Sequence, residues 1–133
     1  TMQSRGNEFG ATTGRPRRCG WFDVPLVRKA ADINGFDDIA LMKIDVLDGF
    51  GEVPVCTSYD GLGYNVPSTS RGFESVRPVY KTLSGWTRTT LGITRWKDLP
   101  DNARRYVEFL EDGIGVRISY VSTGPGENDV IFR

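Results

Sequence analysis

DLPDNARRYVEFLEDGIGVRISYVSTGPG, residues 98–126, decides the fold of this chain, because it joins a helix, a strand and a loop without interruption. Asp98-Leu-Pro100 is a favoured helix start, and Gly113 and Gly115 are expected to stop the helix. The apolar positions recur at helical spacing, at Ala103, Val107, Leu110 and Ile114. Val116–Val121 then predicts a strand, and a glycine-bearing loop follows at its carboxyl end. A helix that leads directly into a strand indicates an α/β domain.

A second main helix is predicted nearer the start of the chain, over Val24–Ile33. Asp23 is a favoured N-cap residue, and Asn34-Gly35 is a favoured helix end. The apolar residues of this helix lie at i, i+4 and i+7, with two more beside them: Leu26, Ala30 and Ile33, then Val27 and Ala31.

Further segments have the composition of strands: Ile39–Ile44, Val53–Tyr59, Tyr64–Pro67, Val76–Leu83 and Val130–Phe132. The first is short and mostly apolar, so we expect it to be buried on both faces. Tyr64–Pro67 is expected to form a hairpin with Val53–Tyr59, and Pro78 places its strand at a sheet edge. The polar stretch around Trp86 is expected to be an ordered surface loop held by that side chain. The result is a single compact mixed α/β domain with two main helices.

Composition limits the function classes open to the chain. Its 133 residues fit one domain, and its 17 basic and 17 acidic residues give a net charge of +0, which argues against a nucleic-acid-binding protein. Histidine is absent, and the 2 cysteines do not form a CxxC pair, so a zinc cluster is not indicated. No run approaches the roughly 18 apolar residues of a membrane helix. We expect a cytoplasmic protein without a membrane partner, in which residues 1–5 are added residues or a disordered start and residues 6–133 form the domain.

The first loop that could carry chemistry is Thr12–Arg18, within the longer run Gly10–Gly20. Its three arginines lie within four residues, and Pro16 keeps the segment extended, so planar guanidinium groups can bind phosphate or carboxylate oxygens. Thr12 and Thr13 add hydroxyl donors. The segment therefore indicates a site for more than one acid, with a solvated basic loop and a nucleic-acid patch as the alternatives.

The second loop is Met42-Lys-Ile-Asp45, at the end of a predicted strand. A carboxylate such as that of Asp45 can accept two hydrogen bonds from guanine N1–H and the 2-amino group, a donor pair that adenine lacks. The aliphatic stem of Lys43 can lie across a base, with its ammonium towards solvent or phosphate. The alternative is a strand end that carries charges without binding anything.

The third loop, Ser122–Gly126, also follows a strand directly. Ligands of open α/β sheets bind beyond the carboxyl ends of the strands, where a glycine-bearing turn exposes its backbone. A tight turn without a ligand is the alternative. Three such loops in one small domain favour a binding site more strongly than any one of them.

Several motifs resemble the carboxyl-terminal third of the adenylosuccinate synthetase family, in order and at similar spacing. They are Glu8–Trp21 (EFGATTGRPRRCGW), Lys43–Gly49 (KIDVLDG), Gly85-Trp86, Asp98-Leu-Pro100 and Val121–Pro125 (VSTGP). The resemblance extends from about Gly6 to Phe132, and its first block is the most specific. It implies part of a homodimeric cytoplasmic ligase that uses GTP and Mg²⁺ to condense IMP with L-aspartate into adenylosuccinate, the first committed step from IMP to AMP.

The resemblance also assigns roles by motif match. The aspartate and IMP loop would comprise Ala11, Thr12, Thr13, Gly14, Arg15, Pro16 and Arg17. In that loop Thr12 and Thr13 would bind the aspartate carboxylates, Arg15 would bridge aspartate and IMP, and Arg17 would face aspartate and GTP. The GTP site would comprise Arg17, Lys43, Ile44, Asp45, Ser122, Thr123 and Gly124.

Some positions depart from the family pattern. Met42 stands where the family usually has a hydroxyl residue, and Ser84 where it often has proline. The family's phosphate loop, catalytic Asp and His and magnesium ligands have no counterpart here, so we expect no catalytic residue and no metal ligand in this chain. The alternative function is a stand-alone nucleotide- or phosphate-binding module without catalysis.

Overall fold

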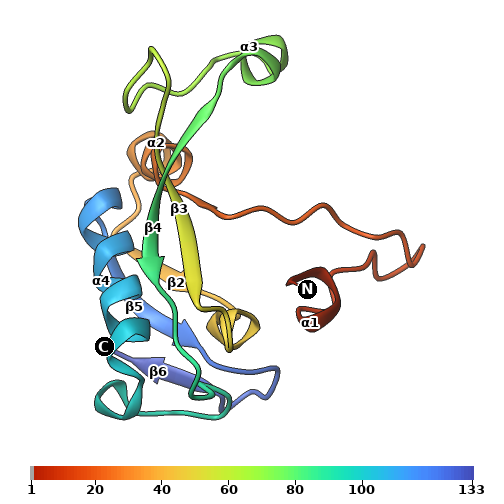
Figure 1. Cartoon of the computed structure of the whole chain (residues 1–133), viewed down its shortest axis with the longest axis vertical. Coiled ribbons are helices and arrows are strands. Elements are labelled where there is room, and N and C mark those ends of the chain that lie inside the picture. Colours follow the sequence, from red (N-terminus) through yellow and green to blue (C-terminus); the bar gives the residue numbers. More distant parts are fainter. Residues whose placement is uncertain (1) are drawn as a thin grey trace.

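Two three-stranded sheets and the helices around them make up the computed structural model, in which residues 2–133 are described (Figure 1). The described elements follow in the order α1 (Met2–Arg5), β1 (Phe22–Asp23), α2 (Val24–Asn34), β2 (Asp38–Leu41), η1 (Ile44–Leu47), β3 (Glu52–Tyr59), α3 (Ser70–Ser75), β4 (Pro78–Ser84), η2 (Trp96–Asp98), α4 (Asp101–Ile114), β5 (Arg117–Ser122) and β6 (Val130–Phe132). The predicted mixed α/β class is confirmed. The start of the chain, for which we expected added or disordered residues, carries the short helix α1.

The two sheets differ in shape. One has the order β1-β3-β4, and its antiparallel β3–β4 pair forms a long arm with α3 at the far end (Figure 1). The other has the order β2-β5-β6, with β2 parallel to β5 and β6 antiparallel to β5. Because β2 and β5 run in parallel, their carboxyl ends, and the loops that leave them, meet at one edge of this sheet.

The core lies where α4 covers the second sheet. All four predicted apolar positions of α4 are buried and are joined by Tyr106, while Ile118, Val121 and Ile131 face them from β5 and β6. Burying an aliphatic side chain of this size contributes about 1.5–3 kcal/mol. The apolar periodicity of residues 103–114 therefore identified the core correctly.

The two glycines expected to end α4 have different roles. Gly115, with φ +79°, is the left-handed C-cap, and its N–H donates to the carbonyl of Glu111. Gly113 lies inside the helix, where a Cβ would stand 2.9 Å from Cγ1 of Val24 on α2. The prediction that Gly113 stops the helix is wrong, because its missing side chain lets α2 and α4 approach closely.

The helix α2 has the predicted caps but a different buried face. Asp23 accepts a hydrogen bond from the Leu26 N–H at 3.0 Å, and Gly35 is the C-cap. Val24 and Ala31 are buried, whereas Leu26 and Ile33 are 44% and 70% exposed. The prediction is therefore wrong for Leu26 and Ile33, whereas Ala31 and Val27, predicted beside them, do pack against the core together with Val24.

Three strand predictions need correction or refinement. Tyr64–Pro67 is not a strand: β3 pairs with β4 instead, and the Tyr59 N–H closes a tight turn onto the Gly63 carbonyl. The strand predicted over residues 39–44 ends at Leu41, and exposed Ala40 shows that it is not buried on both faces. The strand β4 does lie at a sheet edge, as its proline predicted.

The loop that follows β4 is ordered by its tryptophan, as predicted. Trp86 is 4% exposed, and its Nε1 donates to Asp48 Oδ1 at 2.7 Å. Asp48 also accepts hydrogen bonds from the Thr89 hydroxyl and from both the N–H and the hydroxyl of Thr90, at 2.7–2.9 Å. One carboxylate thus ties this loop to the residues that follow η1.

Candidate functional site

A cleft of about 710 Å³ opens where the carboxyl ends of β2 and β5 meet. Its walls come from three segments: residues 5–7 after α1, residues 42–46 around the start of η1, and residues 122–130 after β5. The parallel pairing of β2 and β5 brings the second and third segments together, although they are about 80 residues apart in sequence. Two of the three loops singled out in the sequence therefore meet in one cavity.

Asp45 has the least satisfied side chain in this cleft. It lies in the first turn of η1, and its Oδ1 is buried without a hydrogen-bond partner among the described residues. Burial raises the pKa of its carboxyl, and nearby Asp48 and Asp129 raise it further, whereas a hydrogen bond from its own backbone and the charge of Lys43 lower it. Buried acceptors in folded proteins are normally paired, so this oxygen indicates a place for a donor from a ligand.

Lys43 connects the cleft to the start of the chain. Its backbone has φ 61°, a left-handed conformation that is uncommon for a residue with a side chain. Its Nζ donates to the Gly6 carbonyl at 2.7 Å and forms an ion pair with Glu8. We expected this ammonium to face solvent or phosphate, but in the structure it is directed to these two protein oxygens and not to Asp45.

The loop after β5 is closed by Asp129. The Gly126 N–H donates to Asp129 Oδ2 at 2.9 Å, and the Thr123 N–H donates to the Asp129 carbonyl at 2.8 Å. At Gly124 a Cβ would lie 2.5 Å from Oδ2 of the same carboxylate, so a side chain there would displace Asp129 from the Gly126 N–H. The buried Ser122 hydroxyl donates to the Gly124 carbonyl at 3.1 Å.

Three of the seven residues assigned to the GTP site do not line the cleft: Arg17, Ile44 and Thr123. The Thr123 side chain is fully buried and donates to the Ile93 carbonyl at 2.8 Å. Ile44 is 1% exposed and belongs to the core. Lys43, Asp45, Ser122 and Gly124 line the cleft, whereas Ile44 and Thr123 support it from behind.

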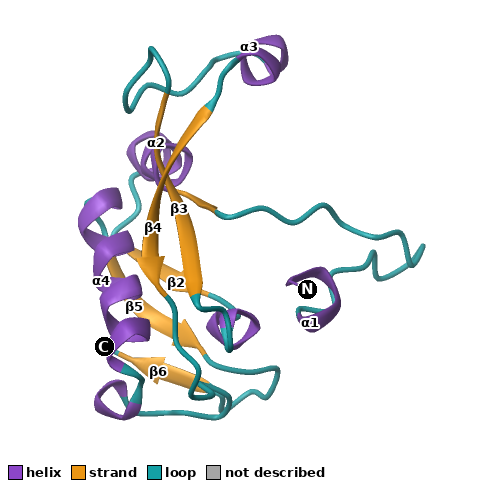
Figure 2. Ribbon diagram, viewed as in Figure 1, coloured by secondary structure: helices purple, strands orange, loops and turns teal. Residues whose placement is uncertain are grey.

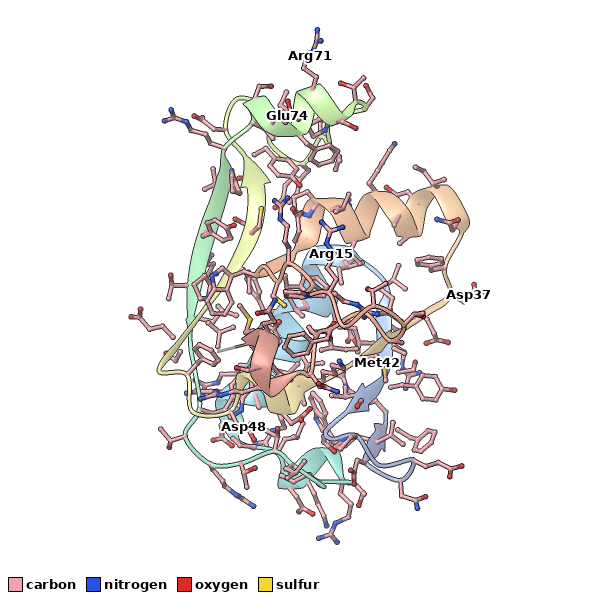
Figure 3. The ribbon with its side chains drawn as sticks, turned by 90° about the vertical axis from the view of Figure 1, so that its right-hand side faces the viewer. Arg15, Asp37, Met42, Asp48, Arg71 and Glu74 are labelled. Carbon is pink, nitrogen blue, oxygen red and sulfur yellow. The ribbon has the colours of Figure 1, made fainter. Side chains whose placement is uncertain are left out.

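The arginine loop lies outside this cleft. Its base is a short hairpin in which Phe9 pairs with Pro16, and the Gly10 N–H donates to the Arg15 carbonyl at 2.8 Å. Every residue from Ala11 to Gly20 is exposed. Figure 2 draws most of the segment between α1 and β1 as loop, and in Figure 3 the part that carries Arg15 lies in front of the rest of the chain.

A single carboxylate connects the arginine loop to the cleft. Glu8 pairs with Lys43 through Oε1 and with Arg17 Nη1 through Oε2, the latter at 3.2 Å. The pKa of Glu8 is lowered, chiefly by its hydrogen bond from Lys43, so it is ionised at neutral pH. Sequence reasoning quoted Glu8 as the first residue of a family motif but gave it no role, and it did not single out Asp129, because no local pattern predicts the distant partner of either residue.

The described residues contain neither a cluster of metal-ligating side chains nor a membrane-spanning helix. Between residues 2 and 133 we find no group of three or more His, Cys, Asp or Glu side chains arranged to hold a metal ion. Across the same span, none of the helices has both the length and the apolar character needed to cross a bilayer.

The sequence is similar to proteins of known function. A family model described as adenylosuccinate synthetase matches residues 1–131. The adenylosuccinate synthetase of Solibacter usitatus is 49% identical over 136 residues, covering 99% of this chain, and that of a Marinomonas species is 50% identical over 131 residues. The chain spans 31% and 30% of the length of these two relatives.

The fold is also similar to that of a solved structure. The structure of fully ligated adenylosuccinate synthetase from Plasmodium falciparum matches this fold with a TM-score of 0.93 at 32% sequence identity. The match covers 99% of this chain and 33% of that one. The similarity therefore extends through nearly all of this chain and over about a third of the larger protein.

Proposed function

The chain belongs to the adenylosuccinate synthetase family, and we propose that it is the carboxyl-terminal third of such an enzyme, residues 6–133 forming the domain. In this proposal the complete enzyme is a GTP-dependent ligase that condenses IMP with L-aspartate to adenylosuccinate. The chain supplies the guanine end of the GTP site and the loop that binds aspartate. It is inactive alone.

The unpaired Oδ1 of Asp45 carries this proposal. Guanine presents two adjacent donors, N1–H and the 2-amino group, and an ionised carboxylate can accept both. A buried acceptor left without a partner is costly, so a base that supplies the missing hydrogen bond is favoured over one that does not. Recognition of this kind discriminates far more strongly than pocket shape.

The rest of the cleft suits a purine base. The exposed side chain of Met42 and the stem of Lys43 offer flexible apolar surface against the base. Gly124 has no room for a side chain and brings its backbone close to the cleft. Ser122 lies beside it, with Ile44 and Thr123 as the supporting layer.

The arginine loop suits an acidic substrate. The exposed residues Ala11–Arg17 present hydroxyl donors and guanidinium groups, and a guanidinium group can bind a carboxylate with two parallel hydrogen bonds. We assign Thr12 and Thr13 to the aspartate carboxylates and Arg15 to a bridge between aspartate and IMP. Arg17, at the base of the loop, faces both aspartate and GTP, while Ala11, Gly14 and Pro16 shape the turn.

In this proposal the magnesium ligands and the catalytic groups belong to the other part of the enzyme. The complete enzyme is proposed to be a cytoplasmic homodimer. Every step of the chemistry depends on groups outside this chain, which contributes binding and orientation.

The test is the Asp45→Asn variant of a full-length synthetase that carries this sequence. An amide presents a donor towards guanine's donor pair, so we expect kcat/KM for GTP to fall about 100-fold, in line with the loss of charged hydrogen bonds. The wild-type enzyme should prefer GTP to ITP, which lacks the 2-amino group, and the variant should use the two within about twofold of each other. Steady-state kinetics with both nucleotides measure this.

Asp112→Asn is the matched control, because Asp112 is exposed on α4, outside the cleft. It removes the same charge and should leave the kinetics with both nucleotides unchanged. If Asp45→Asn retained the wild-type ratio of GTP to ITP efficiency, the cleft would not be the guanine site and the proposal would fall.

A further inference from the structure

Glu8 lies between the two loops to which the proposed function assigns different substrates. Its carboxylate holds Lys43 of the cleft with one oxygen and Arg17 of the arginine loop with the other. The partners are 35 and 9 residues away in sequence. Among the described residues no other side chain is recorded in ion pairs with both loops.

The backbone around Glu8 is held as firmly as its side chain. The Glu8 N–H donates to the Gln3 carbonyl, and its own carbonyl accepts from the Arg17 N–H, both at 2.9 Å. The amide of Gln3 donates in turn to the Arg17 carbonyl at 2.6 Å. The carboxylate therefore extends from a fixed point, at a set distance from the backbone of Arg17.

Charge around Glu8 explains why a carboxylate is needed there. A second cavity, of about 330 Å³, shares Lys43 and Met42 with the cleft, and its other lining residues include Glu8, Arg17 and Arg18. Three cations line this space, and they would repel one another if no anion stood among them. Glu8 supplies that anion, and its two oxygens pair with Lys43 and Arg17.

The stability of the fold does not depend on these contacts. The side chains of Glu8, Lys43 and Arg17 are 24%, 48% and 59% exposed, and ion pairs this exposed to solvent contribute little to folding. These ion pairs instead fix where the Lys43 and Arg17 side chains lie. With Glu8 and the Gly6 carbonyl as its partners, the Lys43 ammonium is kept from Asp45, only two residues away, whose Oδ1 remains unpaired.

We propose that Glu8 is a positioning residue: it holds the Lys43 ammonium away from Asp45, so that this carboxylate stays open for guanine, and it fixes Arg17 at the base of the aspartate loop. This inference rests on the proposed function of the two loops. Without the charge of Glu8, Lys43 turns to the carboxylate of Asp45, whose charge it already feels, and occupies the acceptor that the base requires. Arg17 at the same time loses its orientation towards aspartate.

The test is Glu8→Gln in the full-length synthetase, with KM and kcat measured for GTP, ITP and aspartate. We expect KM for GTP and for aspartate each to rise about tenfold, with kcat within about twofold and an unchanged thermal midpoint. Glu8→Asp, which keeps the charge on a shorter side chain, should give intermediate KM values. In a Lys43→Met background, Glu8→Gln should change KM for GTP much less than it does in the wild type, because no ammonium remains to compete for Asp45 and only the effect through Arg17 is left.

Asp98→Asn is the matched control, since it breaks an equally exposed ion pair, that with Arg95, away from both loops. It should change none of these values. Unchanged KM values in Glu8→Gln, a fall in kcat or thermal midpoint alone, or an undiminished effect in the Lys43→Met background would each overturn the role of Glu8. The Asp45→Asn experiment distinguishes failure of the Glu8 role from failure of the proposed function. It tests the guanine site through the ratio of kcat/KM for GTP to that for ITP, in an enzyme that keeps Glu8.

Discussion

Asp45 shows how function and stability oppose each other at a single residue. Its carboxylate is held in a partly buried turn, beside two other carboxylates and with one oxygen unpaired. A group placed in this way destabilises the protein when no ligand is bound, and sites of this kind are often more stable once the functional residue is replaced. The same feature that suits Asp45 to guanine is therefore a cost in the free protein.

This leads to a pH-dependent prediction for Asp45→Asn. Burial raises the folded-state pKa of Asp45 above its ordinary value of 3.8, so the group favours folding most below that value and loses this contribution as pH rises through the raised pKa. The asparagine variant does not titrate. We expect it to be more stable than the wild type near neutral pH, with the difference shrinking as the pH falls to about 3.

Urea unfolding of the ligand-free full-length protein at several pH values measures this difference. Asp112→Asn serves again as the control, because it removes the same charge from an exposed position outside the cleft. A wild-type protein more stable than Asp45→Asn at neutral pH would show that the carboxylate has a partner that satisfies it.

At the scale of the element, the contact between α2 and α4 depends on a missing side chain. Gly113 lies in the last turn of α4 and faces Val24, which is 2% exposed at the start of α2. Alanine is favoured over glycine inside a helix by about 1 kcal/mol, so local propensity alone predicts that Gly113→Ala stabilises the protein. The 2.9 Å approach of a Cβ to a buried, branched side chain opposes that gain.

We predict that the packing effect wins. Gly113→Ala should lower the free energy of unfolding by about 1–2 kcal/mol, because overfilled contacts between buried elements cost more than the helix propensity returns. Denaturant unfolding of wild type and variant gives the value.

The partner position supplies the control for this prediction. In a Val24→Ala background the added methyl group has space, so Gly113→Ala should become neutral or stabilising there. Equal destabilisation in both backgrounds would mean that the cost does not arise at this contact.

At the scale of the whole molecule, this chain encloses the cleft more completely than it encloses the arginine loop. The cleft is formed by three segments of the chain, whereas the arginine loop is exposed along its length and extends away from the sheets (Figure 1). The chain spans about a third of the length of its relatives. Under the proposed function, the remaining walls of both sites belong to the rest of the enzyme.

Ligand binding by this chain alone tests that view. We predict that GDP, IMP and aspartate, added separately, shift its thermal midpoint by less than about 1 °C, because each site is incomplete. A ligand present at about 100 times its Kd would add roughly 2.7 kcal/mol and raise the midpoint by several degrees. A shift of that size in the 133-residue chain would favour the alternative, a module that binds a nucleotide or phosphate by itself.

The sequence by itself determined the elements that depend on neighbouring residues. The apolar spacing of residues 103–114 gave α4, Asp23 and Gly35 gave the ends of α2, and Pro78 gave an edge strand. It also identified the carboxylate and the glycine loop that line the cleft. Periodicity, capping and proline geometry act over a few residues, so a single sequence carries them completely.

Only the tertiary structure decided which surfaces meet. On α2, packing buried Val24 and Ala31 and left Leu26 and Ile33 exposed, although all but Val24 belonged to the predicted apolar set. Long-range pairing gave β3 its partner β4, placed Thr123 behind the cleft and brought Glu8 to Lys43. These outcomes depend on packing and charge between segments tens of residues apart, for which no local pattern in the chain carries the information.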